Sequence, residues 1–235
     1  MNPFQSLPEG TVTSPAGFTA VAVAAGIKQE NQLDLALVVS DTDCSCGALF
    51  TQNQVVAAPV IVDRETLAVN NSRLRAVVIN AKNANACTGE PGLANARATQ
   101  QAAAAALGCA ADQILVLSTG VIGVPLPMDR LAAGIAVGAK GLSVGNGRLA
   151  AEAIMTTDTR PKHLAVRLDL SGGPVTIGGM AKGAGMIHPN MATMLAFVGT
   201  DAAATPAELA LALRAVARES FNALHVDTHT STNDT

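Results

Sequence analysis

The densest group of chemically capable residues lies between Gly178 and Phe197, which reads GGMAKGAGMIHPNMATMLAF. Its glycines allow the backbone to approach a ligand closely, and Lys182 supplies a positive charge in otherwise apolar surroundings. The glycines fit neither a dinucleotide-binding nor a P-loop spacing, and the alternative is a glycine-rich connection that enters a buried strand at Met194. From composition alone we favour that structural interpretation.

The same segment contains a threonine and a histidine, Thr193 and His188. A threonine hydroxyl is a poor nucleophile unless a base lies beside it, and a threonine that begins a chain can use its own α-amine for this purpose. Such a threonine must be exposed by cleavage. A histidine five residues upstream invites assignment as a general base, but the α-amine suffices, and we interpret His188-Pro189 as shaping the loop.

The cysteines and the remaining histidines do not form a metal-binding pattern. Cys44-Ser45-Cys46 lacks the usual gap of two residues, and no paired histidines follow at ligand spacing. We interpret the four cysteines as buried or idle thiols, and we expect chemistry without a metal or a cofactor. These cysteines and histidines are Cys44, Cys46, Cys87, Cys109, His225 and His229.

Composition restricts the class of protein. The 235 residues are 49% hydrophobic and 14% charged, which favours a folded chain with a large core. Aromatic residues make up 2%, and the formal charge of −3 comes without a long basic run, so a nucleic-acid-binding surface is not expected. The start lacks a secretory signal pattern and no stretch is apolar enough to span a membrane, so we expect a cytoplasmic protein that acts on a small molecule or another protein.

Strand and helix patterns alternate along the chain, which predicts an α/β fold without a clear domain boundary. Runs rich in Val, Ile and Leu predict strands at Leu35 to Val39, Ala76 to Asn80, Ile114 to Ser118, Leu164 to Leu170, Val175 to Gly178 and, near the end, Leu224 to Asp227. Helices are predicted at Asn95 to Leu107, at Met128 to Ala139 and after Thr205, where Thr205 and Glu208 form a capping box and Leu209, Leu213 and Val216 line one face.

Several ordered motifs resemble those of one family. The run KGAGMIHPNMATMLAF is similar to the self-cleavage signature of the arginine-biosynthesis ornithine acetyltransferase (glutamate N-acetyltransferase) family. Further matches follow the family order from near the start to the end of the chain. They are PAGFTAVAVAAGIK, NANACTG (83–89), STGVIGVPLPMD (118–129), IMTTDTRPK (154–162), SFN (220–222) and TSTNDT (230–235).

This resemblance implies an α/β/β/α sandwich built from two chains that arise by self-cleavage between Ala192 and Thr193. Residues 1–192 would form the α chain, and residues 193–235 the N-terminal part of the β chain, with the remainder absent. Thr193 would be the acyl-accepting nucleophile, and Thr119 and Gly120 the pair that stabilises the oxyanion. Thr159 and Lys182, together with Thr193, match substrate-binding positions.

The implied reaction moves acetyl from N-acetylornithine to glutamate through an acetyl-threonine, with a heterotetramer of two α and two β chains as the implied assembly. Bifunctional members also accept acetyl-CoA as donor. Two alternatives remain open. One is an amidase or aminopeptidase that uses the same N-terminal threonine but passes the acyl group to water. The other is an inactive, truncated relative that stays uncleaved.

Three features depart from the family pattern. Family chains continue well past TSTNDT. The usual Asn-Ser-Gly-Asn reads Asn80-Ala81-Lys82-Asn83, which places a charged residue where a small flexible pair is usual. The usual Asp-Gly-Asp before TSTND reads Asp227-Thr228-His229, which removes one acidic residue.

Overall fold

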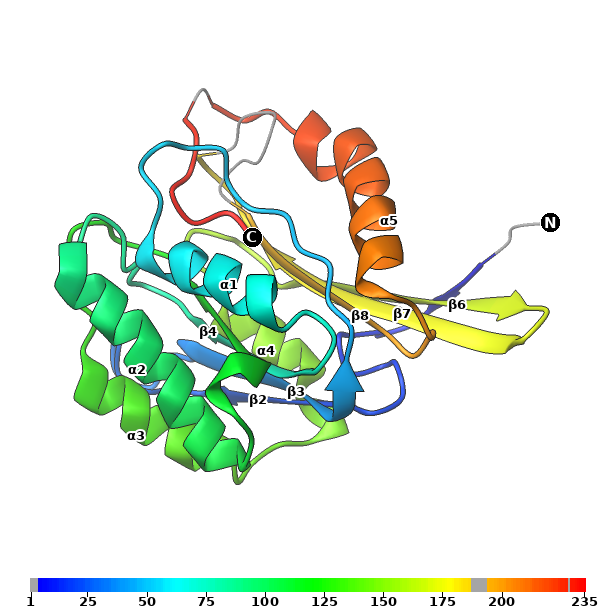
Figure 1. Ribbon diagram of the computed structural model, residues 1–235, viewed down its shortest axis with the longest axis horizontal. Coiled ribbons are helices and arrows are strands. Elements are labelled where there is room, and N and C mark those ends of the chain that lie inside the picture. The colour runs from blue at the N-terminus through cyan, green and yellow to red at the C-terminus, as the bar shows by residue number, and fades with distance from the viewer. Residues whose placement is uncertain (1–3, 187–193, 228) are drawn as a thin grey trace.

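The structure, a computed structural model, describes residues 4–186, 194–227 and 229–235. In this part of the chain the strands form two four-stranded sheets (Figure 1). One sheet has the order β2-β3-β4-β5 and consists of Phe18–Val23 (β2), Leu35–Cys44 (β3), Leu74–Asn80 (β4) and Ile114–Ser118 (β5). The other has the order β1-β6-β7-β8 and consists of Gln5–Leu7 (β1), Lys162–Leu170 (β6), Gly173–Lys182 (β7) and Leu195–Thr200 (β8).

Neighbouring strands are antiparallel except for β4 and β5, which are parallel. β6 and β7 form a hairpin in which Leu170 lies opposite Gly173, so two residues make the turn. β7 also pairs with β8, and in this pairing Lys182 lies opposite Leu195. Lys182, the last residue of β7, is thereby placed next to the first residue of β8.

Three helices pack on one side of the β2-β3-β4-β5 sheet (Figure 1). Pro59 lies in the first turn of one of them, where its missing N–H has no intrahelical partner to lose. Gly108 ends another in the left-handed conformation that glycine adopts without strain. These three helices are Ala58–Val69 (α1), Gly89–Leu107 (α2) and Met128–Gly138 (α3). Two further helices lie elsewhere, Gly147–Ala153 (α4) and Pro206–Glu219 (α5).

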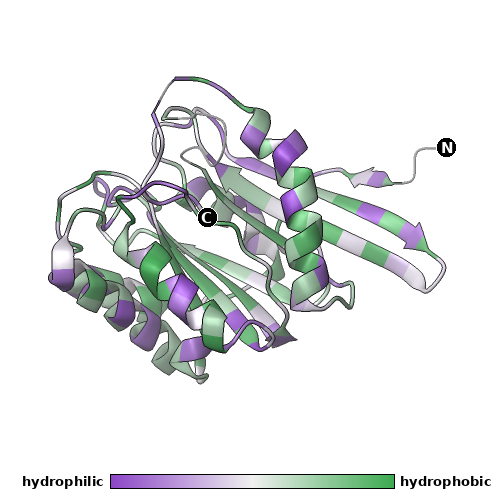
Figure 2. Ribbon diagram, turned by 45° about the horizontal axis from the view of Figure 1, so that its top comes forward, coloured by the Kyte–Doolittle hydropathy of each residue, from purple (hydrophilic) through white to green (hydrophobic). Residues whose placement is uncertain are grey.

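Both faces of the β2-β3-β4-β5 sheet are buried. In β3, Leu35 and Leu37 pack toward the helices, whereas Ala36 and Val38 pack toward the other sheet. This arrangement explains why these strands are continuous apolar runs without alternation. Figure 2 shows the same pattern as hydrophobic strands inside the molecule and mixed hydropathy along the outer helices.

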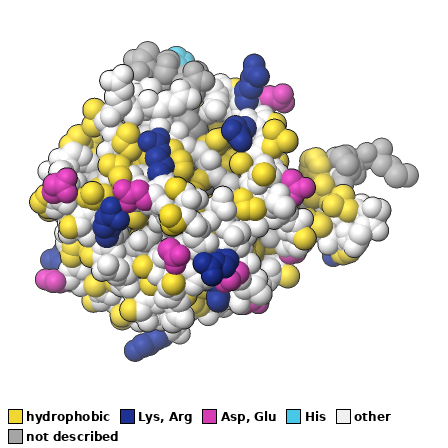
Figure 3. Space-filling model, in the orientation of Figure 1, with side chains coloured by type: hydrophobic (Ala, Val, Ile, Leu, Met, Phe, Trp, Pro, Cys, Tyr) yellow, Lys and Arg dark blue, Asp and Glu magenta, His cyan; other side chains and the backbone are white. Residues whose placement is uncertain are grey.

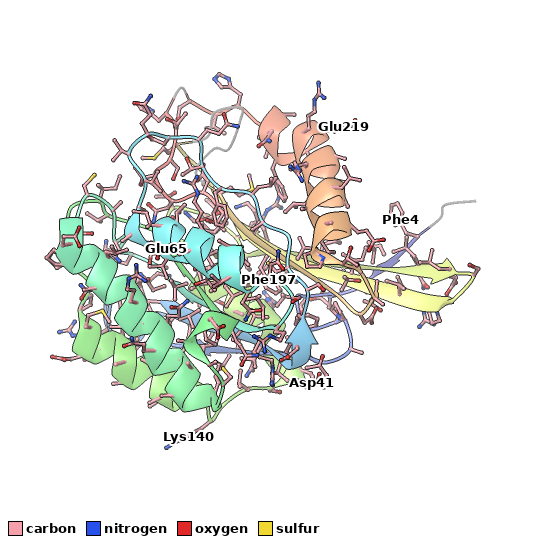
Figure 4. The ribbon with its side chains drawn as sticks, in the orientation of Figure 1. Phe4, Asp41, Glu65, Lys140, Phe197 and Glu219 are labelled. Atoms are coloured by element: carbon pink, nitrogen blue, oxygen red, sulfur yellow. The ribbon has the colours of Figure 1, made fainter. Side chains whose placement is uncertain are left out.

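The layer between the two sheets combines large apolar side chains with the small residues of one helix. Ala150, Ala151 and Ala153 of α4 are fully buried there, together with Met180 of β7 and Leu195 of β8. Phe18 and Phe197 meet edge to face with ring centroids 6.3 Å apart. Figure 4 shows Phe197 near the middle of the molecule, while Lys140 projects outward. The alanines of α4 therefore allow this helix to pack closely between the sheets.

The structure confirms most predicted elements. All five strand runs from Leu35 to Gly178 lie within strands, and the predicted helices lie within α2 and α5 or match α3 to within a residue. The Thr205 and Glu208 capping box is present in both directions. α2 begins at Gly89, earlier than predicted, because Gly89, Pro91 and Gly92 occupy its first turn, where proline costs no hydrogen bond.

Two predictions were wrong in detail. Leu224 to Asp227 is not a strand; it follows a 3₁₀ turn at Phe221–Ala223, and Val226 is 58% exposed instead of pairing in a sheet. Within α5, Val216 is 59% exposed, and Ala217 is the buried residue. β1, β2, α1 and α4 were not predicted as elements, whereas the strand expected at Met194 is present as β8, which begins at Leu195.

On the face shown in Figure 3, Lys and Arg side chains are interspersed with Asp and Glu, with no broad field of one sign. Within residues 4–186, 194–227 and 229–235, no helix is long and apolar enough to cross a membrane.

Candidate active site

Thr119 and Gly120 follow the end of β5 and enter a loop that is pinned by backbone hydrogen bonds. The N–H of Thr119 donates to the Asn80 carbonyl at 3.0 Å, and the N–H of Val121 donates to the Lys82 carbonyl at 2.9 Å. Thr119 is buried. Among the residues that the structure describes, none accepts a hydrogen bond from the Gly120 N–H.

Gly120 occupies a conformation and a space that only glycine fits. Its φ is +137°, and a Cβ at this position would lie 2.1 Å from the carbonyl carbon of Lys82. The loops that follow β4 and β5 therefore touch backbone to backbone at this point. The contact fixes the direction of the Gly120 N–H.

Lys182 lies in the same interior space, 3% exposed, at the end of β7. Its Nζ donates a hydrogen bond of 3.0 Å to the Thr119 hydroxyl oxygen. Burial lowers the pKa of Lys182, and the carboxylates of Asp158 and Asp234 oppose that change. The structure thus brings three of the predicted site residues together: Thr119, Gly120 and Lys182.

Thr159, also predicted to bind substrate, is exposed on the loop between α4 and β6. Its neighbour Asp158 accepts hydrogen bonds from the Gly183 N–H, at 2.8 Å, and from the Lys162 ammonium. Burial acts to raise the pKa of Asp158, but these hydrogen bonds outweigh burial and lower it. The Thr159 loop is therefore anchored beside Lys182, while the Thr159 side chain is exposed.

The predicted nucleophile and cleavage site, Thr193 and Ala192, lie outside the described residues, as does His188. The description resumes at Met194. The N–H of Met194 donates to Asp234 Oδ1 at 2.9 Å. On the other side of the gap, the Met186 N–H donates to Asp227 Oδ2 at 2.7 Å. Two carboxylates from one segment, 227–235, therefore hold the residues on either side of positions 187–193.

The end of that segment, Ser231 to Asp234, is buried despite being polar. Its main chain bonds to the loop before α1, with the Thr51 N–H donating to the Asp234 carbonyl and the Thr51 hydroxyl to the Ser231 carbonyl. The Asn233 amide donates to the carbonyls of Ala84 and Ser118. The segment thereby lies against the end of β5, next to Thr119.

Asp234 was not predicted as a site residue. Burial raises its pKa to about 7, although the Ser231 hydroxyl, the Met194 N–H and the Lys182 ammonium all oppose the rise. Its second oxygen, Oδ2, is buried without a hydrogen-bond partner among the described residues. The signal in the sequence was TSTNDT, a run of short polar residues that matched the family motif without a role for any one of them.

A second missed feature is the amide network under the Thr119 loop. The Ser118 hydroxyl donates to Asn80 Oδ1 at 2.6 Å, the Asn80 amide donates to the Asn83 carbonyl, and the Asn83 amide donates to the carbonyls of Val124 and Pro125. The two loops that follow β4 and β5 are joined by hydrogen bonds of these asparagine side chains. In the sequence, Asn83 belongs to NANACTG and Ser118 to STGVIGVPLPMD, and Asn80 lies outside both motifs.

Lys82, the second departure from the family pattern, lies in this network with φ +82°. A lysine in this left-handed region is strained, whereas a glycine there is not. Its side chain is exposed, and its carbonyl still accepts from Val121.

The thiols differ in their surroundings. Burial raises the pKa of Cys46 to about 11, so this thiol stays protonated at neutral pH, whereas the Cys87 thiol is free and exposed. Within the described ranges, no three His, Cys, Asp or Glu side chains gather as metal ligands would.

Comparison with curated proteins gives consistent matches. The chain is 53% identical over 227 residues to the arginine biosynthesis bifunctional protein ArgJ of Symbiobacterium thermophilum, covering 96% of this chain and 56% of that protein. It is 47% identical over 234 residues to ArgJ of Parasynechococcus marenigrum, covering 57% of that protein. The chain therefore spans about half the length of the curated relatives that it matches.

Two solved structures share the fold. ArgJ from Bacillus halodurans superposes with a TM-score of 0.75 at 40% identity, covering 80% of this chain and 97% of that chain. Ornithine acetyltransferase from Mycobacterium tuberculosis, solved in complex with ornithine, superposes with a TM-score of 0.72 at 46% identity, covering 79% and 98%. The predicted fold class is confirmed. The ArgJ family model matches residues 19–235, and the chain belongs to the ArgJ family.

Proposed function

We propose that this protein carries the acyl-accepting part of an acetyltransferase that moves acetyl from N-acetylornithine to glutamate. Thr193 is the nucleophile, made available when the bond between Ala192 and Thr193 is cut. Residues 1–192 then form one chain, and residues 193–235 begin the other. The relative from Mycobacterium tuberculosis bears the name ornithine acetyltransferase and was solved with ornithine, which supports this substrate class.

The observation that carries the proposal is the hydrogen bond between Lys182 and Thr119. Its two residues come from the ends of β7 and β5, and Lys182 lies opposite Leu195, two residues after Thr193. A lysine that is 3% exposed requires a function or a partner to offset its loss of hydration. One of its three N–H groups is used by Thr119, which leaves donors for a substrate carboxylate.

Thr119 and Gly120 are assigned to the oxyanion. The Lys182 ammonium donates to the Thr119 oxygen, so the hydroxyl hydrogen of Thr119 is directed elsewhere, toward an acceptor in the same space. The Gly120 N–H is a second donor, fixed by the backbone contact with Lys82. Donors held in place before charge develops stabilise a tetrahedral intermediate more than mobile donors do.

The two half-reactions use the same groups. Thr193 Oγ attacks the acetyl carbon of N-acetylornithine, the α-amine of Thr193 takes the hydroxyl proton, and that proton passes to the departing ornithine amine. Glutamate then attacks the acetyl-threonine through its amine, and N-acetylglutamate leaves. Thr159 and Lys182 bind the substrate amino acid, with no metal or cofactor needed. Acetyl-CoA is a second possible donor, and a tetramer of two α and two β chains is the assembly.

The test is intact-mass spectrometry of the purified chain with and without N-acetylornithine. We expect two pieces divided at residue 193 and a gain of one acetyl group on the piece that begins with Thr193. Thr193→Ala is the matched control and should show neither change. Acetate release without N-acetylglutamate would favour the amidase alternative, and an intact, unmodified chain would favour the inactive relative.

A further inference from the structure

Asp234 is the buried acid that the proposed transfer cycle leaves without a role. Its carboxyl is 1% exposed, and Oδ1 accepts from the N–H of Met194, the residue joined directly to Thr193. Oδ2 is buried and has no partner among the described residues. One oxygen of this acid has therefore lost its hydration without gaining a hydrogen bond in the described structure, a cost that calls for an explanation.

The charged group that acts on Asp234 is Lys182, which approaches from the end of β7. The Ser231 hydroxyl and the Met194 N–H are its neutral hydrogen-bonding neighbours. Asp158 and Lys162 act on Lys182 from the loop before β6. Because burial raises the pKa of Asp234 to about 7, its carboxyl can both accept and release a proton near neutral pH.

The cleavage step requires such a group. In the transfer cycle the α-amine of Thr193 serves as the base, but before cleavage that nitrogen is the amide of the Ala192–Thr193 bond and cannot accept a proton usefully. The base for cleavage must therefore be a different group. It must lie beside residue 193 and must return its proton once the bond has broken.

We infer that Asp234 accepts the hydroxyl proton of Thr193 during self-cleavage and returns it to the departing nitrogen. This inference rests on the proposed function, which makes Thr193 the nucleophile. Thr193 Oγ bonds to the Ala192 carbonyl carbon as its proton passes to Asp234. The bond from that carbon to nitrogen then breaks, and the Asp234 proton moves to the nitrogen. Water hydrolyses the resulting ester, which leaves the Ala192 carboxylate, its proton and a free Thr193 hydroxyl.

The chain contains a matched control for Asp234. Asp63 in α1 is also 1% exposed, its Oδ1 accepts one backbone N–H, that of Val116, at 2.8 Å, and its Oδ2 is buried without a partner in the described structure. Burial raises its pKa as well. Asp63 makes its backbone bond to β5 and not to Met194. It therefore shares with Asp234 its burial, one backbone hydrogen bond and an unpaired oxygen, but has neither its position beside Met194 nor its Ser231 and Lys182 neighbours.

The experiment follows cleavage by gel electrophoresis after pulse-labelled cell-free synthesis, in the absence of any acetyl donor. Wild type should cleave about tenfold faster at pH 8 than at pH 6, since the fraction of ionised Asp234 changes by about that factor across a pKa of about 7. Asp234→Asn keeps an oxygen for the Met194 N–H but cannot accept the proton, and should cleave at least about 100-fold more slowly with no pH dependence.

Asp63→Asn should cleave at the wild-type rate, and Asp234→Glu should recover part of the rate lost in the Asn variant. Circular dichroism of each variant confirms folding. The inference is overturned when Asp234→Asn cleaves within threefold of wild type, when Asp63→Asn is equally slow, or when wild type stays intact at pH 8. Failure of the proposed function gives a different result: a chain that cleaves through Asp234 but whose Thr193 piece gains no acetyl group.

Discussion

Replacement of Gly120 by alanine should destabilise the fold much more than the same change at Gly123. A Cβ on Gly120 would lie 2.1 Å from the Lys82 carbonyl carbon and 2.5 Å from the Asn83 nitrogen. Both neighbours are backbone atoms and cannot rotate away. The loops must separate, which breaks the hydrogen bonds from Val121 to Lys82 and from Thr119 to Asn80.

The magnitude follows from these two effects. The loss of two backbone hydrogen bonds costs about 2 kcal/mol. Alanine at φ +137° adds about 1 to 3 kcal/mol of backbone strain. We therefore expect Gly120→Ala to lower the free energy of unfolding by about 3 to 5 kcal/mol. Gly123 has φ +79° and nothing within 4 Å of the added methyl group, so its change should cost about 1 kcal/mol.

The assay is urea denaturation followed by far-ultraviolet circular dichroism, because the chain has no Trp or Tyr to report by fluorescence. Wild type, Gly120→Ala and Gly123→Ala are measured at one pH. The difference between the two variants reports the backbone collision together with the greater strain at φ +137°. Equal destabilisation of the two variants would refute the close contact between the Thr119 loop and Lys82.

Three further changes have defined outcomes in the same assay. Lys82→Gly should raise the free energy of unfolding by about 1 kcal/mol, because glycine removes the strain at φ +82°. Thr205→Ala should lower it by about 1 kcal/mol through loss of the α5 cap. The stability of Asp63→Asn relative to wild type should increase from pH 5 to pH 8. Burial raises the pKa of Asp63 above 3.8 in the folded protein, so the unfolded chain loses this proton at a lower pH than the folded chain does. The stability of the wild type therefore falls as the pH rises.

Each of these three predictions would be contradicted by a specific result. A neutral or harmful Lys82→Gly would mean that the loop gains more from reduced unfolded-state entropy than it loses in strain. An unchanged Thr205→Ala would mean that α5 is held by its packing against the loop at Gly47 and not by its cap. A constant gap between Asp63→Asn and wild type across pH would mean that Asp63 is ionised in the folded state.

Strand positions could be predicted because the central sheet is buried on both faces. Ile114 to Ser118 is apolar on every residue but the last, and its predicted bounds match β5. β2 was missed because Phe18–Val23 alternates with alanine and threonine, which weakens the apolar signal. α1 was missed since it has no side-chain cap and its buried face includes Asp63 and Thr66, two polar residues.

The site was predictable only as separate motifs. Thr119, Gly120 and Lys182 were each chosen by resemblance, but their meeting depends on β5 and β7 lying in different sheets, which no local pattern encodes. Asp234 was overlooked because its importance arises from burial against Met194, a contact between residues 40 positions apart. Local spacing rules apply to helices and strands and do not reach contacts of this kind.

The pairing of β7 with β8 determines what would be seen after a break near residue 193. β8 and α5 would belong to the smaller piece and β7 to the larger, yet six residue pairs from Ile177 with Thr200 to Lys182 with Leu195 would still join them. The Asn233 amide and the Thr232 carbonyl add bonds to Ala84 and Ala57. The two pieces would copurify and elute together in gel filtration, and only denaturation would reveal that the polypeptide is no longer continuous.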